Sequence, residues 1–225
     1  MDKQYIFLAG LPRSGSTLFT SIINQNPDVF ASSTSFLCDA LYHTYQIWNS
    51  RQALHGGSND VGVKKVIESI IPSFYIHQTE SVIIDKSFTW GSPYNLTVLI
   101  NALGYVPKFI VMERDVPEIV ASFERLMNVS PNFNRNIQTS IIDPCMLSYK
   151  NLLSQIPKHC FVVSYERLCN DTIKLLEEFY AFINKPNFEH NLSHITNTST
   201  DNDDIWGLVG MHDIMPTIRT YGNGT

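Results

Sequence analysis

Short apolar runs alternate along the chain with longer stretches in which apolar residues recur at every third or fourth position. The short runs are rich in β-branched residues and predict strands at 5–9, 82–84, 109–112 and 160–164, with 28–31 as a fifth. The longer stretches predict helices at 17–24, 36–48, 61–77 with a break near Pro72, 94–103, 117–127, 139–154 and 172–183. This alternation is typical of βαβ units and predicts an α/β fold with three layers, in which helices flank a central parallel sheet of four to five strands.

Polar stretches at 32–35, 128–136 and 184–204 interrupt this pattern and predict loops. The chain has 225 residues, of which 44% are hydrophobic, and this suffices for one sizeable core. We therefore expect one domain over 1–225, with a helical insertion at 36–78 and a polar tail at 184–225. Aromatic residues at helical spacing in the insertion favour a place in the core, and a pocket lining is the alternative.

Charge and hydropathy exclude several classes of partner. Charged residues make up 16% of the chain and the formal net charge is −5, so the totals contain no basic surface large enough for a nucleic-acid backbone. The apolar stretch at 5–9 is too short for a signal peptide, and no other run approaches the roughly 20 apolar residues of a membrane span. We expect a cytoplasmic protein that contacts neither nucleic acid nor membrane; the oligomeric state stays open.

A glycine-rich segment joins the first predicted strand to the first predicted helix: Gly10-Leu11-Pro12-Arg13-Ser14-Gly15-Ser16-Thr17-Leu18. It nearly fits the phosphate-binding pattern G-x-x-x-x-G-K-[ST], with Ser16 in place of the lysine. Successive backbone N–H groups and the positive end of the helix dipole still converge on an anion. Arg13 supplies the cation that the lysine otherwise provides. The plain alternative is a turn that ends in a helix N-cap.

The run Arg13-Ser14-Gly15-Ser16-Thr17-Leu18 resembles the phosphosulfate loop of sulfotransferases that use 3′-phosphoadenosine 5′-phosphosulfate (PAPS), above all the tyrosylprotein and related bacterial members. The resemblance implies a P-loop-type fold in which this loop binds the 5′-phosphosulfate. It also implies the reaction, in which the sulfuryl group passes from PAPS to a hydroxyl or amine and adenosine 3′,5′-bisphosphate is released. Because a sulfuryl group carries less charge than a phosphoryl group, positioned cations and N–H donors suffice, and we expect no metal.

Two further segments point to the nucleotide. Arg114 ends the strand predicted at 109–112, and Ser122 lies two turns into the next predicted helix, so both can face one phosphate. The resemblance implies that they grip the 3′-phosphate of PAPS; a surface pair of Arg114 with Asp115 and a serine bonded to its own turn is the alternative. After the last strand, Tyr165 stands in a segment that resembles one lying near the nucleotide in the family, and a core position fits it equally.

Lys86 follows the strand predicted at 82–84 and belongs to the same sheet edge. The resemblance implies that this lysine contacts the bridging oxygen of the phosphosulfate. An ammonium at that place stabilises the charge that grows on the leaving phosphate in the transition state, so Lys86 and Arg13 are the predicted catalytic cations. The alternative is a strand-end lysine in solvent.

The general base is the part of the family pattern that this sequence lacks. Tyrosylprotein sulfotransferases carry a glutamate shortly after the loop helix, where this chain has no carboxylate at 31–35. Cytosolic small-molecule members carry a histidine two residues beyond the lysine, where this chain has Phe88. His212 is the candidate that we retain, because imidazole titrates near neutral pH and the tail can fold over the site. The other candidates are Asp39, Asp85, His43 and His55.

The acceptor and two rival functions stay open at this stage. The acceptor is a small molecule, a glycan or a peptide, and the insertion at 36–78 is one place where it can bind. A P-loop kinase or nucleotide hydrolase would share the sheet and the loop, but Ser16 replaces the lysine that such proteins use. A catalytically inactive PAPS-binding protein would account for the missing base.

Overall fold

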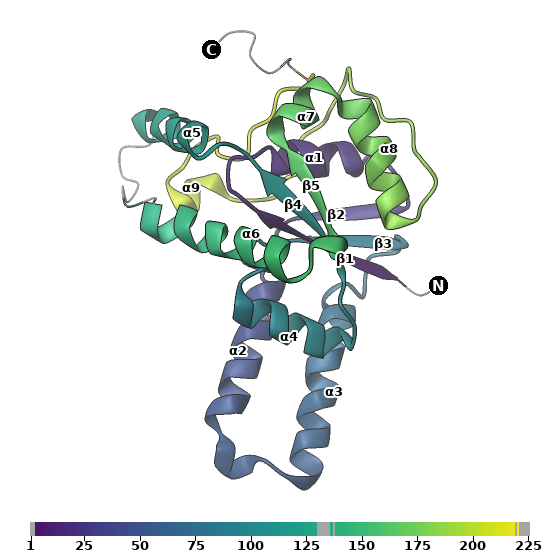
Figure 1. The fold of residues 1–225 in the computed structure, drawn as a ribbon, viewed down its shortest axis with the longest axis vertical. Helices are drawn as coiled ribbons and strands as arrows, with labels where there is room; N and C mark the ends of the chain where they lie inside the picture. The colour runs from purple at the N-terminus through teal and green to yellow at the C-terminus, as the bar shows by residue number, and fades with distance from the viewer. Residues whose placement is uncertain (1–2, 130–135, 137, 219, 221–225) are drawn as a thin grey trace.

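The computed structural model describes residues 3–129, 136, 138–218 and 220, and its centre is a parallel sheet of five strands (Figure 1). The strand order is β2-β3-β1-β4-β5, and every neighbouring pair is parallel. The strands are β1 (Gln4–Gly10), β2 (Val29–Thr34), β3 (Val82–Lys86), β4 (Lys108–Glu113) and β5 (Cys160–Ser164). The predicted α/β fold with a central parallel sheet is confirmed.

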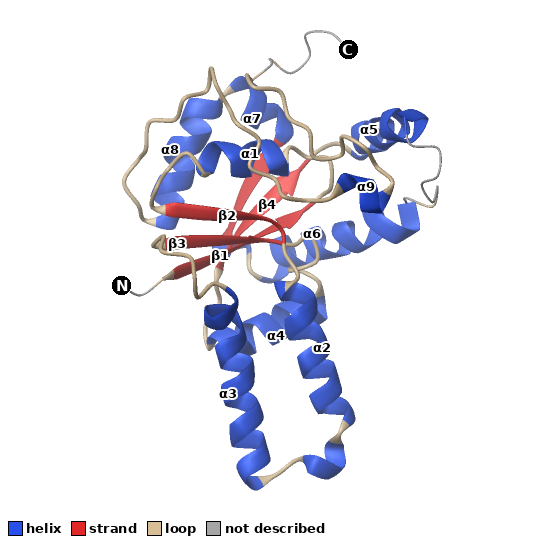
Figure 2. Cartoon of the chain, turned by 180° about the vertical axis from the view of Figure 1, so that it is seen from behind, coloured by secondary structure: helices blue, strands red, loops and turns tan. Residues whose placement is uncertain are grey.

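Helices cover both faces of this sheet, which explains why its strands are apolar at nearly every position (Figure 2). Ile6 and Leu8 of β1 share one core with α1 (Ser16–Ile23) and α8 (Thr172–Ile183). The alternate residues Phe7 and Ala9 share a second core with α4 (Pro93–Leu103) and α6 (Asp143–Gln155) on the other face. Successive side chains of a strand point to opposite faces, so one short apolar run supplies both cores.

The remaining helices connect or extend these layers. They are α2 (Leu37–Ser50), α3 (Gly57–Phe74), α5 (Val116–Val129), α7 (Tyr165–Asn170) and the one-turn α9 (Asp203–Trp206). Two turns of 3₁₀-helix lie at Gln52–Leu54 and Pro157–His159, and a π-helical turn at Gln138–Ile142 leads into α6. The bounds of β5 and α8 are those predicted, whereas α7 and α9 were not predicted.

Two expectations about secondary structure are wrong. The stretch at 32–35 is a loop only at its end, because β2 continues to Thr34, which pairs with Lys86 after a register shift. The Ser32 hydroxyl accepts a hydrogen bond from the backbone N–H of Lys86 at 2.9 Å, in place of a backbone carbonyl of a neighbouring strand. The break near Pro72 is absent, and α3 continues to Phe74 because Ile71 is buried in the core. Of the loop predicted at 128–136, residues 128–129 belong to α5 and 130–135 lie outside the described residues.

The insertion at 36–78 forms a hairpin of α2 and α3 that projects from the sheet (Figure 1). Its base is buried, where Leu37, Leu41 and Ile71 join the core on that face. Its far end is exposed, with Leu54 55% exposed. The aromatic and apolar spacing of this segment therefore reflects core packing at the base of the hairpin.

The C-terminal tail runs back across α1 (Figure 2). Its backbone is held to itself by a hydrogen bond from Ile195 N to Pro216 O at 2.7 Å. It is held to the body by Thr198 N, which donates to Ser21 Oγ at 3.2 Å. Ile195 and Leu208 are each 2% exposed. The tail, although polar in sequence, is thus packed at the carboxyl end of the sheet, where the loop at 10–18 lies.

Candidate active site

The glycine-rich segment forms the turn between β1 and α1, at the carboxyl end of the sheet. It is anchored by Leu11 N, which donates to Met112 O at 2.8 Å, and by the Ser14 hydroxyl, which donates to Leu11 O. Arg13 (φ 55°) and Gly15 (φ 83°) take left-handed backbone conformations, which turn successive N–H groups toward one side. Within the described part of the chain no side chain caps α1, so its first N–H groups are available to an anion.

Gly15 also lets an aromatic ring lie against this loop. A Cβ at Gly15 would stand 2.7 Å from Cδ2 of Tyr165, which is closer than such atoms approach. Tyr165 begins α7 directly after β5, and its ring also lies against Arg114, whose guanidinium carbon is 4.1 Å from the ring centroid. The loop, the ring and the guanidinium therefore form one continuous wall, with a flat aromatic surface beside a cation.

Arg13 connects three segments that are distant in sequence. Its Nε donates to the Ser122 hydroxyl of α5 at 3.0 Å, and its Nη1 donates to the Met211 carbonyl of the tail. Nη1 of Arg114 in turn donates to the Arg13 carbonyl at 2.7 Å, and Nε of Arg114 donates to Glu118 at 2.9 Å. The structure thus places Arg13 between Ser122 and Arg114, the two residues that the sequence predicted to face one phosphate.

Two arginines at one place favour an anion between them. Burial is the main cause that lowers the pKa of Arg13, and the neighbouring charge of Arg114 lowers it further. The Asp203 carboxylate opposes both effects, and an anion bound beside the two arginines would oppose them further. The electrostatics of the loop therefore agree with its backbone geometry.

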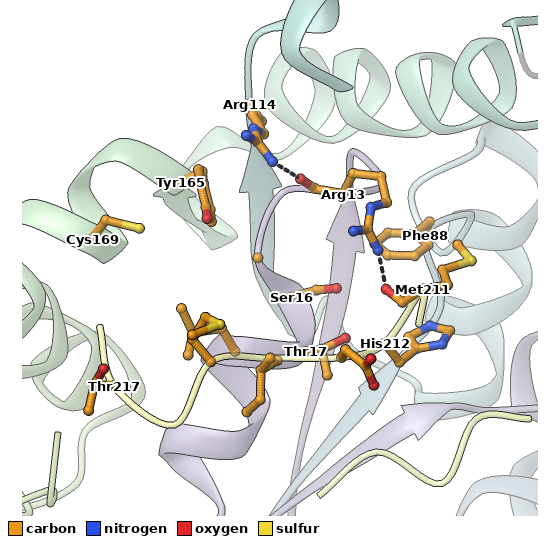
Figure 3. Close-up of a pocket in the computed structure, with 15 residues that line it drawn as sticks. Arg13, Ser16, Thr17, Phe88, Arg114, Tyr165, Cys169, Met211, His212 and Thr217 are labelled. Carbon is orange, nitrogen blue, oxygen red and sulfur yellow. Dashed lines mark hydrogen bonds between the residues drawn. The ribbon is translucent and has the colours of Figure 1, made fainter. Parts of the chain in front are cut away.

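These groups line a cavity of about 200 Å³. Figure 3 shows the loop and α1 on one side, Arg114 and Tyr165 on another, and the tail from Met211 onward closing a third. The predicted residues that line it are Arg13, Gly15, Ser16, Thr17, Leu18, Arg114, Tyr165 and His212. Ser14, Lys86 and Ser122 are buried next to it, and the hairpin of α2 and α3 contributes no lining residue within the described chain.

Lys86 is the last residue of β3 and is buried, with 1% of its surface exposed. Its Nζ lies 3.7 Å from Oδ2 of Asp201 in the tail and 5.8 Å from the ring centroid of Phe88. Burial lowers the pKa of Lys86, and the Asp201 carboxylate opposes that shift. The alternative of a solvent-exposed lysine is therefore wrong, and the ammonium is buried with a carboxylate partner.

The tail brings His212 to the same place between two carboxylates. Nδ1 of His212 lies 2.5 Å from Oδ1 of Asp203, and Nε2 lies 3.3 Å from Oδ2 of Asp201. The backbone N–H of His212 donates to Oδ2 of Asp203 at 2.9 Å. Lys86, Asp201, His212 and Asp203 thus form a continuous chain of polar contacts from β3 to α9. Lys86 and His212 were predicted from the sequence, whereas both aspartates were missed because they stand in no recognisable motif.

The other candidate bases lie elsewhere. Asp85 is 2% exposed, and its carboxylate accepts hydrogen bonds from Ser35 Oγ at 2.5 Å, Trp90 Nε1 at 2.7 Å and the Tyr75 hydroxyl. Burial raises the pKa of Asp85. These contacts give Asp85 a structural role in the core. Asp39, His43 and His55 are exposed on or beside α2, and the His55 ring stacks on Trp48 at 4.1 Å.

Comparison with known proteins agrees with this geometry. The profile of the sulfotransferase family matches residues 5–190. The chain belongs to the sulfotransferase family. A putative protein-tyrosine sulfotransferase of Caenorhabditis briggsae is 24% identical over 198 residues, covering 85% of this chain and 69% of that protein.

Solved sulfotransferase structures share the fold. The sulfotransferase domain from the curacin biosynthetic pathway superposes with a TM-score of 0.60 at 18% identity, covering 92% of this chain and 83% of that one. A mouse sulfotransferase complexed with PAP superposes with a TM-score of 0.53 at 14% identity, covering 84% of this chain and 62% of that one. The P-loop-type fold that the resemblance implied is confirmed.

The family match divides the site of this sulfotransferase into two parts. The loop, Lys86, Arg114, Ser122 and Tyr165 lie inside residues 5–190, whereas Asp201, Asp203 and His212 follow the matched segment. The part of the site that faces Lys86 is therefore supplied by a segment outside the family profile.

None of the helices within the described residues has both the length and the apolar composition that a membrane span requires.

Replacing Asp201 by asparagine is expected to destabilise the fold in a pH-dependent way. Burial favours a higher pKa for Asp201, but the charges of Lys86 and His212 and hydrogen bonds from Ser199 and Thr34 outweigh it and lower the pKa. The stability that this group contributes is therefore full above its ordinary value of 3.8 and is lost as the pH falls below that value toward the lowered pKa of the fold. At pH 7 we expect a loss of about 3 kcal/mol in the free energy of unfolding, because the buried Lys86 loses its partner.

Urea unfolding of the wild type and of Asp201→Asn from pH 7 to pH 3 measures this effect. The difference between the two proteins should shrink as the pH falls below 3.8. Asp204→Asn is the matched control, because Asp204 is exposed in the same tail and should change little at any pH. A difference of the same size at pH 3 and pH 7 would contradict the paired carboxylate.

Proposed function

We propose that this sulfotransferase moves the sulfuryl group of PAPS to a hydroxyl or amine acceptor and releases adenosine 3′,5′-bisphosphate. The observation that carries the proposal is the pair Arg13 and Arg114 beside the uncapped start of α1, with Ser16 where nucleotide kinases carry lysine. The structural neighbour solved with PAP supports the same class of nucleotide. The kinase alternative has no comparable support.

The donor would lie along the wall that the loop and Tyr165 form. The N–H groups of residues 14–18 and Arg13 would bind the 5′-phosphosulfate, and Tyr165 would contact the nucleotide. Arg114 and Ser122 would bind the 3′-phosphate, whose oxygens would take the place of the Arg13 carbonyl at Nη1 of Arg114 and of the Arg13 guanidinium at Ser122. The cavity is smaller than the about 300–1,000 Å³ of common ligand sites, so we expect the tail at 211–217 to shift when the nucleotide binds.

The chemistry needs a cation at the leaving group and a base at the acceptor. The bond between sulfur and the bridging phosphate oxygen breaks, the bond between sulfur and the acceptor oxygen or nitrogen forms, and the acceptor proton leaves. Lys86 and Arg13 would stabilise the negative charge on the departing phosphate. Nε2 of His212 would take the proton, since His212 lines the cavity beside Phe88, where the cytosolic pattern has its histidine.

The acceptor class stays a small molecule, a glycan or a peptide. The Caenorhabditis briggsae relative is named as a protein-tyrosine sulfotransferase, but the stretch at 31–35 of this chain carries no glutamate. Ser32–Thr34 are part of β2 next to Lys86, so this departure falls close to the reacting atoms. The cytoplasmic location stays a prediction, and so does a single domain over 1–225 in which the insertion at 36–78 lines the acceptor site.

The nucleotide assignment predicts selective stabilisation by a 3′-phosphate. In a thermal-shift titration, adenosine 3′,5′-bisphosphate should raise the unfolding temperature, corresponding to about 2.7 kcal/mol at 100 times its Kd. ATP, ADP and adenosine 5′-monophosphate should have little effect at the same concentration. Arg114→Ala should abolish the selectivity, whereas Arg51→Ala on the exposed hairpin should retain it. Stabilisation by ATP with Mg²⁺ instead would support a kinase-like protein.

The base assignment predicts that His212→Ala lowers kcat by about 10²–10⁴-fold, the usual contribution of a general base. Binding of adenosine 3′,5′-bisphosphate should remain. His194→Ala in the same tail is the control, because the His194 side chain is exposed. Adding Phe88→His to His212→Ala should restore part of the rate, since Phe88 flanks Lys86. An unchanged rate in His212→Ala would remove this residue from the mechanism. If the wild type binds the nucleotide but transfers the sulfuryl group to no acceptor, the protein is an inactive binding protein.

Metal independence is also a prediction of the proposed chemistry. Positioned arginine and lysine side chains should meet the charge requirement of sulfuryl transfer, so EDTA should leave the rate of transfer from PAPS unchanged. Loss of transfer in EDTA that Mg²⁺ restores would show that the reaction needs a metal.

A further inference from the structure

Asp203 contacts His212 at two points with the two oxygens of one carboxylate. Oδ1 lies 2.5 Å from the ring Nδ1, and Oδ2 accepts the backbone N–H of the same residue at 2.9 Å. A carboxylate that holds both the backbone and the ring restricts rotation about the bonds between them. The orientation of the His212 ring is therefore set by Asp203.

The surrounding contacts fix both residues in place. Asp203 begins α9, where Asn202 Oδ1 accepts Ile205 N at 3.3 Å and the Asp203 carbonyl accepts Leu208 N at 3.0 Å. On the other side, the Met211 carbonyl accepts from Arg13 and the His212 carbonyl accepts from Asn197 Nδ2 at 2.9 Å. The side chains of Asp203 and His212 are 16% and 12% exposed. These contacts fix both the backbone and the ring of His212 in one orientation.

We propose that Asp203 is a positioning residue for sulfuryl transfer, which orients His212 and keeps a proton on Nδ1 so that Nε2 accepts the proton of the acceptor. This inference rests on the proposed function of His212. A carboxylate accepts a hydrogen bond only from a protonated nitrogen, so the short contact at Nδ1 places the proton there. Nε2 makes the longer contact, 3.3 Å to Oδ2 of Asp201, whose charge is shared with Lys86, and so it is the nitrogen left to accept a proton. Asp203 itself does not line the cavity and acts through the imidazole.

The proton balance is complete within these groups. The acceptor loses a proton to Nε2 as its bond to sulfur forms, and the imidazolium that results lies between Asp203 and Asp201. The charged groups that face it are these two carboxylates, with Lys86 on the far side of Asp201 and Arg13 at the neighbouring carbonyl. Two carboxylates beside one imidazolium stabilise the charge that proton transfer creates.

The experiment compares Asp203→Asn, Asp204→Asn, His212→Ala and the double variant Asp203→Asn/His212→Ala, with PAPS and whichever acceptor the wild type sulfates. Asp203→Asn should lower kcat by about 10²-fold or more with little change in KM for PAPS, because tautomer and orientation are lost while donor binding is kept. The acid limb of its pH–rate profile should move to lower pH, because the imidazolium loses one counter-charge. Asp204→Asn should match the wild type, since Asp204 is exposed on the same turn.

The double variant separates a positioning role from a structural one. If Asp203 acts through His212, Asp203→Asn should cause no further loss of rate in the His212→Ala background. A further loss of similar size in that background, or an Asp203→Asn variant with wild-type kcat and pH profile, would overturn the proposal. If His212→Ala keeps the wild-type rate, the base assignment itself fails. The thermal shift with adenosine 3′,5′-bisphosphate serves as the check that each variant is folded.

Discussion

The buried ammonium of Lys86 requires an opposite charge, and this requirement ties the C-terminal tail to the sheet. Lys86 is 1% exposed at the end of β3, and the carboxylate that faces it at 3.7 Å belongs to Asp201 of the tail. An uncompensated charge in a protein interior costs several kcal/mol, so the tail cannot detach while Lys86 keeps its charge and its place. The positions of Asp203 and His212 follow from that constraint, because His212 contacts both Asp201 and Asp203.

A second link joins the tail to the phosphate loop. Arg13 takes a left-handed backbone conformation inside the loop, and its guanidinium reaches Ser122 of α5 and the Met211 carbonyl of the tail. The loop is therefore held by contacts with α5 and with the tail, in addition to the hydrogen bonds within its own turn. An anion that binds the loop would compete for the same guanidinium, and its binding is coupled to the position of the tail. The tail is therefore the wall of the cavity that we expect to move when the donor binds.

The parts of the site that lie next to strands were predictable because their placement is local. The loop, Lys86 and Arg114 each follow an apolar run, and the carboxyl ends of parallel strands meet at one edge of the sheet. Asp201 and Asp203 stand in a polar stretch without periodicity. Their roles depend on contacts between segments that are far apart in the chain, just as the hydrogen bond from Arg13 to Met211 joins residues 198 positions apart. The end of β2 escaped prediction for a related reason, because Ser32 uses its hydroxyl to bond the backbone of Lys86.

Hydrogen–deuterium exchange with and without adenosine 3′,5′-bisphosphate tests the central claim that the tail is part of the donor site. We expect amide exchange to change in two separate segments at the same nucleotide concentration: the phosphate loop at 10–18 and the tail at 199–213. A change at the loop with the tail unaffected would show that the nucleotide binds without engaging the segment that holds Asp201, Asp203 and His212, and the tail would then not be part of the donor site.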